Sequence, residues 1–476
     1  LSYTELDTVG TSTLITRMNS DINQVQTGVN MCLRLLLRSP FVVFGAMVMA
    51  FTIDTKCALI FAGVIAVLCV IVFSIMLATI PMYRRVQGQL DSVTATTREN
   101  LTGVRVVRAF CKEDAERAKF ERKIQLLTCM QLTVGRISAM MNPATYVVIN
   151  AAVIVLIHTG ALRVQMGALS QGQVVALYNY MSQILVELIK MANLIITLTK
   201  AAACGDRVAA VLAIRSTQKD GEKAPAIDAP RGSVVFDGVS MSYSGAGAES
   251  VSGVSFTAAP GATIGVIGGT GSGKSTLVNL IPRFYDVTSG RVLVDSMDVR
   301  DIRKDELRRR IGVVPQKAML FKGTIRSNLL WGNADATEAD LRDALKVAQA
   351  LDVVSAKSQG LDEPVEQGGR NFSGGQRQRL TIARALVRKP EILILDDSAS
   401  ALDYATDANL RRAIRQMENP PTTFIVSQRA ASVRFADQII VLDDGRVAGM
   451  GTHDELLAAC PVYQEIYASQ FKKEGN

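Results

Sequence analysis

Residues 263–281 read TIGVIGGTGSGKSTLVNLI, an apolar strand followed by a glycine-rich turn and the start of a helix. Four residues separate Gly268 from Gly273-Lys274-Ser275, which is the spacing of a P-loop. Glycines let backbone N–H groups turn toward phosphates, the lysine supplies a positive charge, and the serine hydroxyl can ligate Mg²⁺. Because a strand precedes the turn and a helix follows it, a chance glycine-rich turn is a poor alternative. The predicted phosphate-binding residues are Gly268, Gly269, Thr270, Gly271, Ser272, Gly273, Lys274, Ser275 and Thr276.

The composition differs between the two halves of the 476-residue chain, which is long enough for two or more domains. Long apolar runs lie between residues 39 and 200, whereas residues 230–476 have the composition of a soluble α/β domain. The net charge of +8 could indicate a nucleic-acid partner, but the lysines and arginines lie beside apolar runs without interleaved aromatic residues. This arrangement predicts a lipid bilayer as partner and no nucleic acid. The seven cysteines form no CxxC pair, so neither a disulfide framework nor a zinc site is expected.

Four stretches are apolar and long enough to cross a bilayer as helices, which takes about 20 residues. They are residues 39–53 with the apolar residues before them, 57–83, 137–162 and 174–199. The second stretch holds 27 residues without a charge, which argues against the alternative of core helices in a soluble domain. Residues 84–136 carry eleven Lys and Arg against six Asp and Glu, so the positive-inside rule places them in the cytoplasm.

Two ionisable residues, Glu187 and Lys190, lie inside the fourth predicted span and share one face of a helix. They form either a self-neutralising pair near the inner leaflet or part of a polar transport path, since ionisable groups within membranes usually face an interior. Both alternatives stay open.

The second half predicts short strands alternating with helices. After a linker at 215–230, strands are expected in residues 233–243, 254–259, 263–268, 291–299, 311–316, 391–398, 422–428 and 438–445, with helices at 304–310, 338–350, 376–388 and 405–416. This order indicates a mainly parallel sheet preceded by an antiparallel portion. The expected domains are a helical transmembrane domain (1–214), the linker, and an α/β P-loop nucleotide-binding domain with antiparallel and helical subdomains (231–476).

Two further stretches of the second half carry chemistry. Asp396 ends an apolar strand, where a carboxylate can hold the Mg²⁺ of a P-loop nucleotide, and Asp397 can orient or deprotonate an attacking water. Ser373-Gly374-Gly375-Gln376 opens a helix and offers N–H groups, a hydroxyl and a dipole end to an anion. We therefore expect a second phosphate-binding site about a hundred residues after the first.

With NFSGGQRQRL at 371–380 beside the P-loop, the chain resembles the ATP-binding cassette (ABC) transporters, in which SGGQ is the family signature. The resemblance extends from GTSTLITR at 10–17 to GTH at 451–453. It implies ATP and Mg²⁺ as ligands, with Tyr243 stacked on the adenine and Gln316 near the Mg²⁺. It also implies that Asp403 lies in a loop crossing to a partner cassette and that Glu366 touches cytoplasmic loops. On its own, Tyr243 could be a core aromatic residue, which is the expectation for Tyr285.

In this family the P-loop of one cassette faces the signature of another, so the resemblance implies a dimer. Residues 97–104 and 1–9 resemble the segments that couple the spans to the cassettes. Half-transporters of the family carry six spans, so two more are expected upstream of the four found. The family also implies a multi-pass protein of the plasma membrane with its cassette in the cytoplasm.

The chain departs from the family pattern at two catalytic positions. Asp397 stands where the family has a hydrolytic glutamate, and Gln428 stands where it has a switch histidine. Both changes resemble the degenerate-site subunit of bacterial heterodimeric multidrug exporters. They predict a subunit that binds ATP, turns it over slowly and lends its signature to a partner's site. The expected substrates are amphipathic small molecules, multidrug or lipid-like. The alternative is an ATP-binding regulatory or gating subunit that does not power transport.

Overall fold

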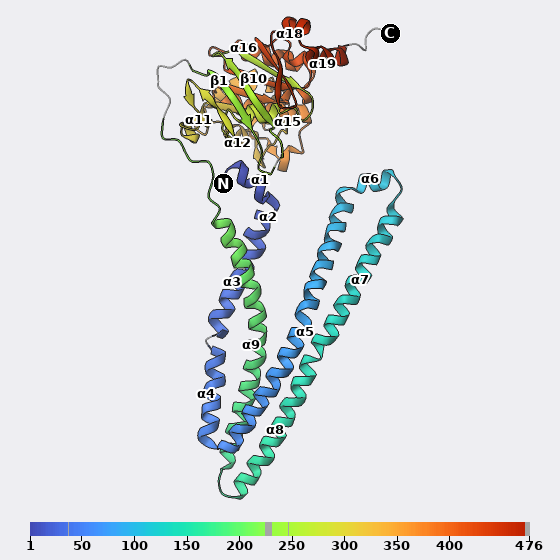
Figure 1. Cartoon of the computed structure of the whole chain (residues 1–476), viewed down its shortest axis with the longest axis vertical. Helices are drawn as coiled ribbons and strands as arrows, with labels where there is room; N and C mark the ends of the chain where they lie inside the picture. The colour runs from blue at the N-terminus through green and yellow to red at the C-terminus, as the bar shows by residue number, and fades with distance from the viewer. Residues whose placement is uncertain (37, 224–230, 246, 472–476) are drawn as a thin grey trace. The chain divides into compact units, whose positions relative to one another are not determined.

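The computed structural model describes residues 1–36, 38–223, 231–245 and 247–471 (Figure 1). The chain divides into two compact units. One is a helical unit, Ser12–Ala213, and the other is a nucleotide-binding unit made of Leu1–Thr11 and Ile214–Asn476. The first eleven residues, which we expected to belong to the transmembrane part, therefore group with the second half of the chain. The cause is aromatic packing, because the Tyr3 and Phe284 ring centroids lie 4.7 Å apart.

The helical unit is built from long helices and short breaks between them. Its elements are α2 (Thr11–Thr16), η1 (Arg17–Asp21), α3 (Ile22–Met31), η2 (Cys32–Leu36), α4 (Arg38–Ile53), α5 (Thr55–Thr102), α6 (Val104–Ala109), α7 (Glu113–Ala139), α8 (Met141–Gln165) and α9 (Gln171–Leu212). The turn between α4 and α5 is fixed by Asp54, whose carboxylate accepts from the Lys56 N–H at 2.7 Å and caps α5. Arg163 Nε donates to the same carboxylate at 2.6 Å, so this turn is joined to the end of α8.

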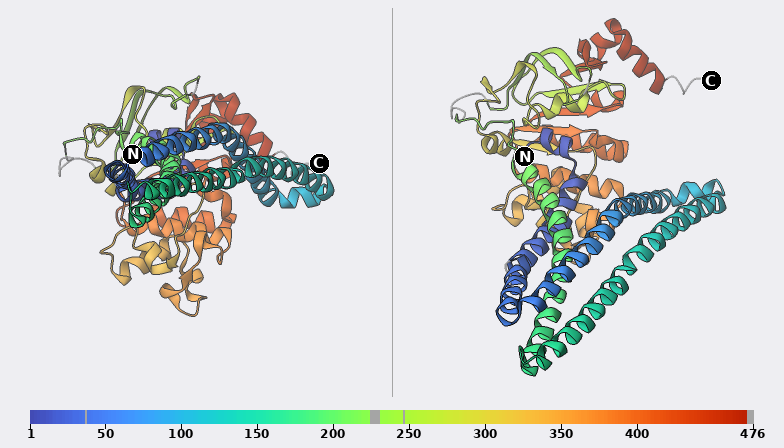
Figure 2. Two further views of the ribbon diagram at one scale, coloured as in Figure 1. Left: turned by 90° about the horizontal axis from the view of Figure 1, so that it is seen from below. Right: turned by 60° about the horizontal axis from the view of Figure 1, so that its bottom comes forward.

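The four predicted spans all fall in helices. They coincide with α4, the first part of α5, α8 with the end of α7, and the middle of α9. Within the described residues, three helical stretches are long and apolar enough to cross a membrane, at Thr11–Ile53, Thr55–Thr102 and Glu113–Gln165. The fourth predicted span, in α9, is not among these three. The charged residues 84–136 form a hairpin in which α5 and α7 lie side by side and α6 closes the end (Figures 1 and 2).

Small residues and one ion pair bring α3 and α9 together. A Cβ atom added to Gly28 would lie 2.1 Å from the Ala201 Cβ, so only glycine permits this crossing. Arg207 of α9 donates to both carboxylate oxygens of Asp21 at 2.8 Å. Within the described residues this bidentate pair closes the end of the α3–α9 contact.

The described residues of the nucleotide-binding unit form three sheets and a set of short helices. Its strands are β1 (Val234–Met241), β2 (Val251–Ala258), β3 (Thr263–Gly268), β4 (Ser289–Val294), β5 (Met297–Asp298), β6 (Ile311–Val314), β7 (Gly323–Thr324), β8 (Pro364–Val365), β9 (Ile392–Asp396), β10 (Thr422–Ser427), β11 (Gln438–Asp443) and β12 (Arg446–Gly451). Its helices are α1 (Tyr3–Val9), α10 (Lys274–Asn279), α11 (Lys304–Arg309), α12 (Ile325–Leu329), α13 (Glu338–Val347), α14 (Leu351–Ser355), α15 (Gly374–Val387), α16 (Tyr404–Arg415), α17 (Ala430–Val433), α18 (His453–Ala459) and α19 (Pro461–Phe471).

The main sheet has the order β12-β11-β3-β10-β9-β6 and is parallel except for β12. A second, four-stranded antiparallel sheet has the order β2-β1-β4-β5, with β1 and β2 before β3 in sequence and β4 and β5 after it, and the predicted fold class is confirmed. Strands β3, β9 and β10 are almost wholly buried because helices and the second sheet cover them. The carboxyl ends of parallel strands share one edge, which brings together the residues that follow β3, β9 and β10.

Candidate functional site

A cleft of about 310 Å³ lies at this sheet edge, within the roughly 300–1,000 Å³ range of small-molecule sites. It collects predicted residues from separate parts of the sequence. The lining residues are Tyr243, Ser250, Thr270, Gly271, Gly273, Lys274, Ser275, Thr276, Gln316, Asp396, Asp397, Val426, Ser427 and Gln428.

Two glycines of the P-loop have no room for a side chain. Gly273 has a φ of 90°, a left-handed conformation that favours glycine, and an added Cβ would lie 2.3 Å from the Ser250 carbonyl oxygen. A Cβ on Gly268 would lie 2.2 Å from the Leu442 carbonyl oxygen. The loop can therefore turn its N–H groups inward only with these glycines.

Lys274 folds back into the P-loop and is 8% exposed. Its Nζ donates to the carbonyl oxygens of Gly268, at 3.0 Å, and Gly269. Burial lowers the pKa of Lys274, while the nearby Asp397 and Asp396 raise it. A phosphate in the cleft would compete with these carbonyls for the ammonium group and would favour its charged form.

Ser275 and Asp396 form the candidate Mg²⁺ site. The Ser275 Oγ donates to Asp396 Oδ1 at 2.9 Å, which joins the P-loop helix to the end of β9. A hydroxyl, a carboxylate and substrate phosphates make the oxygen set that Mg²⁺ prefers, so these residues fit the ion, which would neutralise phosphate charge there. Burial raises the pKa of Asp396, as does Asp397, whereas Ser275 and Lys274 lower it.

Gln316 and Asp397 meet at the outer side of the cleft. Gln316 follows β6, and its Nε2 donates to Asp397 Oδ2 at 3.4 Å. The Asp397 backbone has a φ of 47°, and its N–H donates to the Val426 carbonyl oxygen at 2.9 Å. Asp397 is thus held between β9 and β10 with its carboxylate beside the candidate Mg²⁺ ligands.

Gln428 directly follows β10, and its side chain is exposed. Its carbonyl oxygen accepts from Gln470 Nε2 at 2.7 Å, and the N–H of Ala430 donates to Gln470 Oε1 at 2.9 Å. The backbone of this loop is therefore fixed from outside the cleft.

Tyr243 is held from both sides. Its hydroxyl lies 3.0 Å from the Thr276 Oγ1, and its ring meets Tyr285 edge-on, with centroids 5.0 Å apart. Tyr285 packs against the core, as expected, but its hydroxyl also donates to Asp7 Oδ2 at 2.7 Å. Burial and then Asp7 raise the pKa of the Tyr285 hydroxyl, so it stays a donor. Segment 1–9 therefore contacts the aromatic pair beside the P-loop.

The signature lies outside the cleft, at the start of α15. The Ser373 Oγ accepts from the Gln376 N–H at 3.3 Å, and Gln376 Oε1 accepts from the Ser373 N–H at 3.0 Å, which is a capping box. Ser373 and Gly374 are exposed, and none of the residues 373–376 lines the cleft. An added Cβ on Gly375 would lie 3.1 Å from the Ala401 carbonyl oxygen, so the signature sits beside residues 398–401.

Asp403 and Glu366 also lie outside the cleft. Asp403 caps α16, because its carboxylate accepts from the N–H and the hydroxyl of Thr406, both at 2.8 Å. Glu366 has an exposed side chain and donates its N–H to Asn371 Oδ1 at 3.1 Å. These contacts account for local structure, and the interface roles of both residues stay predictions.

Glu187 and Lys190 form an ion pair on α9, with Nζ and Oε1 2.9 Å apart. Glu187 is 5% exposed and accepts from the Ser39 Oγ of α4 at 2.6 Å. The pair thus lies at the α4–α9 contact, and a transport role for it stays a prediction.

Some cleft residues were not predicted from sequence. Ser427 directly precedes Gln428, and its place at the end of an apolar strand could have identified it. Ser250 reaches the P-loop through the β1–β2 connection, for which the local sequence holds no signal. Gln470, which does not line the cleft but holds the loop of Gln428, lies on the last helix, and no motif marks it.

Comparisons with known proteins agree with this architecture. Residues 1–188 match the ABC transporter transmembrane region, and residues 251–400 match the family described as ABC transporter. An ABC transporter ATP-binding protein of Mycobacterium tuberculosis (strain ATCC 25618 / H37Rv) is 39% identical over 99% of this chain and 81% of its own length. An ATP-dependent lipid A-core flippase of Desulfotalea psychrophila is 32% identical over 97% of this chain and 80% of its own length.

The fold comparison covers nearly the whole chain. The structure of a bacterial Atm1-family ABC exporter with ATP bound superimposes with a TM-score of 0.82 and 25% identity, over 97% of this chain and 81% of that one. These matches agree with the two-part chain, with the P-loop cleft and with the signature at the start of α15. The chain therefore belongs to the ABC transporter family, as an ATP-hydrolysing exporter half-transporter with one transmembrane region and one nucleotide-binding domain.

Proposed function

We propose that this half-transporter exports amphipathic, lipid-like or multidrug-type small molecules across the plasma membrane, with its nucleotide-binding unit in the cytoplasm. The cleft is the observation that supports ATP as the energy source for this export. Lys274 and the Ser275–Asp396 pair lie in it where phosphates and Mg²⁺ are expected. In this proposal Tyr243 binds the adenine, and Gln316, Asp397 and Gln428 surround the terminal phosphate.

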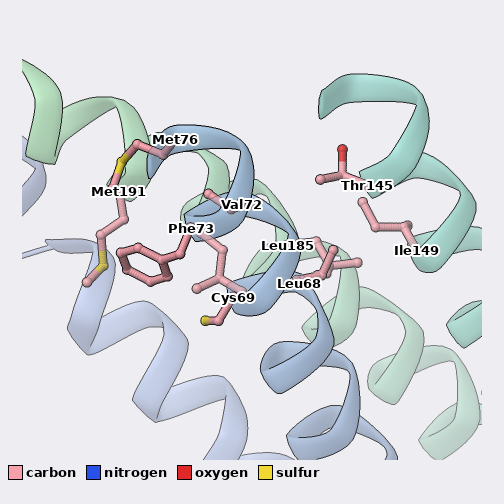
Figure 3. A pocket seen from close by; sticks show the side chains of 10 residues that line it. Leu68, Cys69, Val72, Phe73, Met76, Thr145, Ile149, Leu185 and Met191 are labelled. Carbon is pink, nitrogen blue, oxygen red and sulfur yellow. The ribbon is translucent and has the colours of Figure 1, made fainter. Parts of the chain in front are cut away.

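An apolar pocket in the helical unit supports the substrate class. It lies between α5, α8 and α9 (Figure 3) and is lined by Leu68, Cys69, Val72, Phe73, Met76, Thr145, Ile149, Leu185, Leu188 and Met191. The Thr145 hydroxyl donates to the Met141 carbonyl oxygen at 2.8 Å, so it is already satisfied. At about 90 Å³ the pocket is smaller than a whole small-molecule site and fits an apolar part of a ligand.

The lining of this pocket favours lipid-like molecules over polar ones. Methionines adapt their shape to irregular apolar groups, and two of them line the pocket. Glu187 and Lys190 are absent from its described lining. The similarity to a lipid A-core flippase points to the same substrate class.

The two catalytic departures support a slow site. The Asp397 side chain is one methylene shorter than glutamate, and a catalytic group misplaced by about 1 Å can cost roughly 100-fold in rate. Gln428 can donate a hydrogen bond to phosphate but cannot carry a charge. The outward-facing signature supports a partner, a second half-transporter with glutamate and histidine at these two positions, which would use Ser373–Gln376 in its own ATP site.

Phosphate release by the chain alone and with its partner half-transporter, both in lipid vesicles, tests this proposal. Slow hydrolysis by the chain alone and at least tenfold faster hydrolysis by the pair are expected, since only the pair would assemble a competent site. Rapid hydrolysis by the chain alone would contradict it.

The same two departures favour one alternative, a regulatory or gating subunit that binds ATP without powering transport. Substrate uptake into inverted vesicles separates the two functions. If the pair still transports after the partner's hydrolytic glutamate is replaced by glutamine, the power-supplying role that we assign to the partner is wrong.

A further inference from the structure

One side-chain amide in the last turn of α19 holds the loop that carries Gln428. Gln470 donates to the Gln428 carbonyl oxygen at 2.7 Å and accepts from the Ala430 N–H at 2.9 Å. A carbonyl only accepts and an N–H only donates, so these partners fix which way the amide points. The two bonds immobilise both peptide groups that flank Arg429. The first of these peptide groups also adjoins Gln428, and β10 ends at the residue before it, so Gln470 and β10 together set the direction in which the Gln428 side chain leaves the backbone.

The other contacts of this loop belong to Arg429, whose N–H is part of the same peptide group as the Gln428 carbonyl oxygen, so Ser427 and Gln470 hold that peptide group together. The Arg429 N–H donates to the Ser427 Oγ at 3.0 Å, and its guanidinium donates to the Ser400 carbonyl oxygen at 3.4 Å. Ala430 is fully buried, and a buried N–H without a partner costs about 1–3 kcal/mol. Gln470 supplies that partner.

The helix that presents Gln470 is anchored away from the cleft. Tyr463 is fully buried, and its hydroxyl lies 2.8 Å from His453 Nδ1 at the start of α18. Tyr467 stacks on Phe471 with ring centroids 4.4 Å apart. The position of α19 thus depends on packing among the C-terminal elements, and Gln470 joins this helix to the loop that carries Gln428.

We propose that Gln470 is a positioning residue for the phosphate end of the cleft, and that it aims the Gln428 side chain at the terminal phosphate of ATP. This inference rests on the ATP site proposed above. Orientation matters here because Gln428 is neutral. Its hydrogen bond weakens steeply when donor and acceptor are misaligned, whereas a charged side chain would attract the phosphate over a longer distance.

Equilibrium binding of AMP-PNP and of ADP, each with Mg²⁺, to the full chain in lipid nanodiscs tests the inference. Gln470→Ala is expected to weaken AMP-PNP binding about threefold to tenfold and to leave ADP binding unchanged, since only the terminal phosphate loses a contact. Gln464→Ala is the matched control, because Gln464 also lies on α19 but donates to the Leu457 carbonyl oxygen at 2.8 Å. It should leave the ratio of the two affinities unchanged.

A double-mutant cycle with Gln428→Ala separates positioning from a general packing role. If Gln470 acts through Gln428, then Gln470→Ala has no further effect in the Gln428→Ala background. An effect that persists there, or one that weakens both nucleotides equally, would overturn the inference, as would a wild-type chain that binds AMP-PNP no better than ADP. Hydrolysis by the chain with its partner is measured separately. A failure of the proposed division of labour between the two chains would appear in that measurement, whereas a failure of the inference about Gln470 would appear in the binding measurements.

Discussion

The P-loop and the signature stretch are both serine- and glycine-rich turns that open a helix, but they differ in their surroundings. The P-loop follows the buried strand β3, its lysine is 8% exposed, and residues from β9 and β10 complete a cleft around it. The signature residues Ser373 and Gly374 are exposed, and they are not among the described residues that line the cleft at the sheet edge. The P-loop is therefore surrounded by other residues of its own chain, whereas the signature is exposed, as the proposed role toward a second chain requires.

Removing the P-loop charge should have the largest effect on nucleotide binding by this chain. Lys274→Ala is expected to weaken ATP binding about 10- to 100-fold, since a charge-assisted bond to phosphate is lost. Equilibrium binding of a fluorescent ATP analogue measures it. Lys346→Ala, at an exposed lysine of α13, is the control and should bind normally. Equal losses in both variants would contradict a specific role for Lys274.

The signature should affect the partner and not this chain's own cleft. Ser373→Ala is expected to slow hydrolysis by the assembled pair about tenfold, because the proposed site of the partner would lose a hydroxyl contact to its nucleotide. Each N-cap loss costs roughly 1 kcal/mol of stability. Thr337→Ala removes the same kind of capping box from α13 and controls for this cost. If both variants slow the pair equally, the signature acts only as a cap.

Lengthening the carboxylate at position 397 tests whether reach limits the cleft. Asp397→Glu should raise hydrolysis at this site about fivefold, a gain well below the roughly 100-fold cost of a misplaced catalytic group because Gln428 is unchanged. The measurement is phosphate release by the pair with the partner's own P-loop lysine replaced by alanine. Asp397→Asn, which keeps the length but not the charge, should be slower than wild type. An unchanged rate in Asp397→Glu would place the limit at Gln428 or at the partner's signature.

The smallest expected effect is on stability and depends on pH. Burial raises the pKa of Asp396 above its unfolded value, so the folded state holds this proton more tightly. The contribution of the Asp396 carboxyl to the free energy of unfolding is present below its unfolded pKa and is lost as pH rises through its folded pKa. Asp396→Asn should therefore raise the unfolding midpoint of the nucleotide-free protein by about 2 °C at pH 8, with a smaller gain toward pH 4. Thermal unfolding at both pH values checks this sign, and a gain that grows toward pH 4 would contradict it.

The sequence predicts those parts of the site whose determinants are local. The P-loop spacing, the strand before it and the strand ending at Asp396 follow from residues that are neighbours in the chain. Gln376–Arg388 was expected as a helix, and α15 begins two residues earlier because Ser373 caps it. β12 was not predicted, since RVAGMG has no clear apolar alternation and is a strand only through its pairing with β11.

The contacts that orient the cleft connect residues far apart in sequence. Asp7 meets Tyr285 across 278 residues, and Gln470 meets Gln428 across 42. Such pairs carry no motif, because a hydrogen bond between residues far apart in the chain imposes no local pattern. The bend between α7 and α8 at Met140 was missed for a different reason. Pro143 lies in the first turn of α8, where proline is tolerated, so it marks a helix start only once the break is known.

The chain passes between its two units twice, after Thr11 and after Ala213, and the two passages are clasped together. Glu5 accepts from the N–H and the hydroxyl of Thr217, at 3.0 and 2.7 Å. Burial raises the pKa of Glu5, but hydrogen bonds from Ser2 and Thr217 outweigh it and lower the value to about 2, so the clasp keeps its charge at neutral pH. Because Glu5 precedes the first passage and Thr217 follows the second, this contact keeps the two segments that leave the nucleotide-binding unit next to each other.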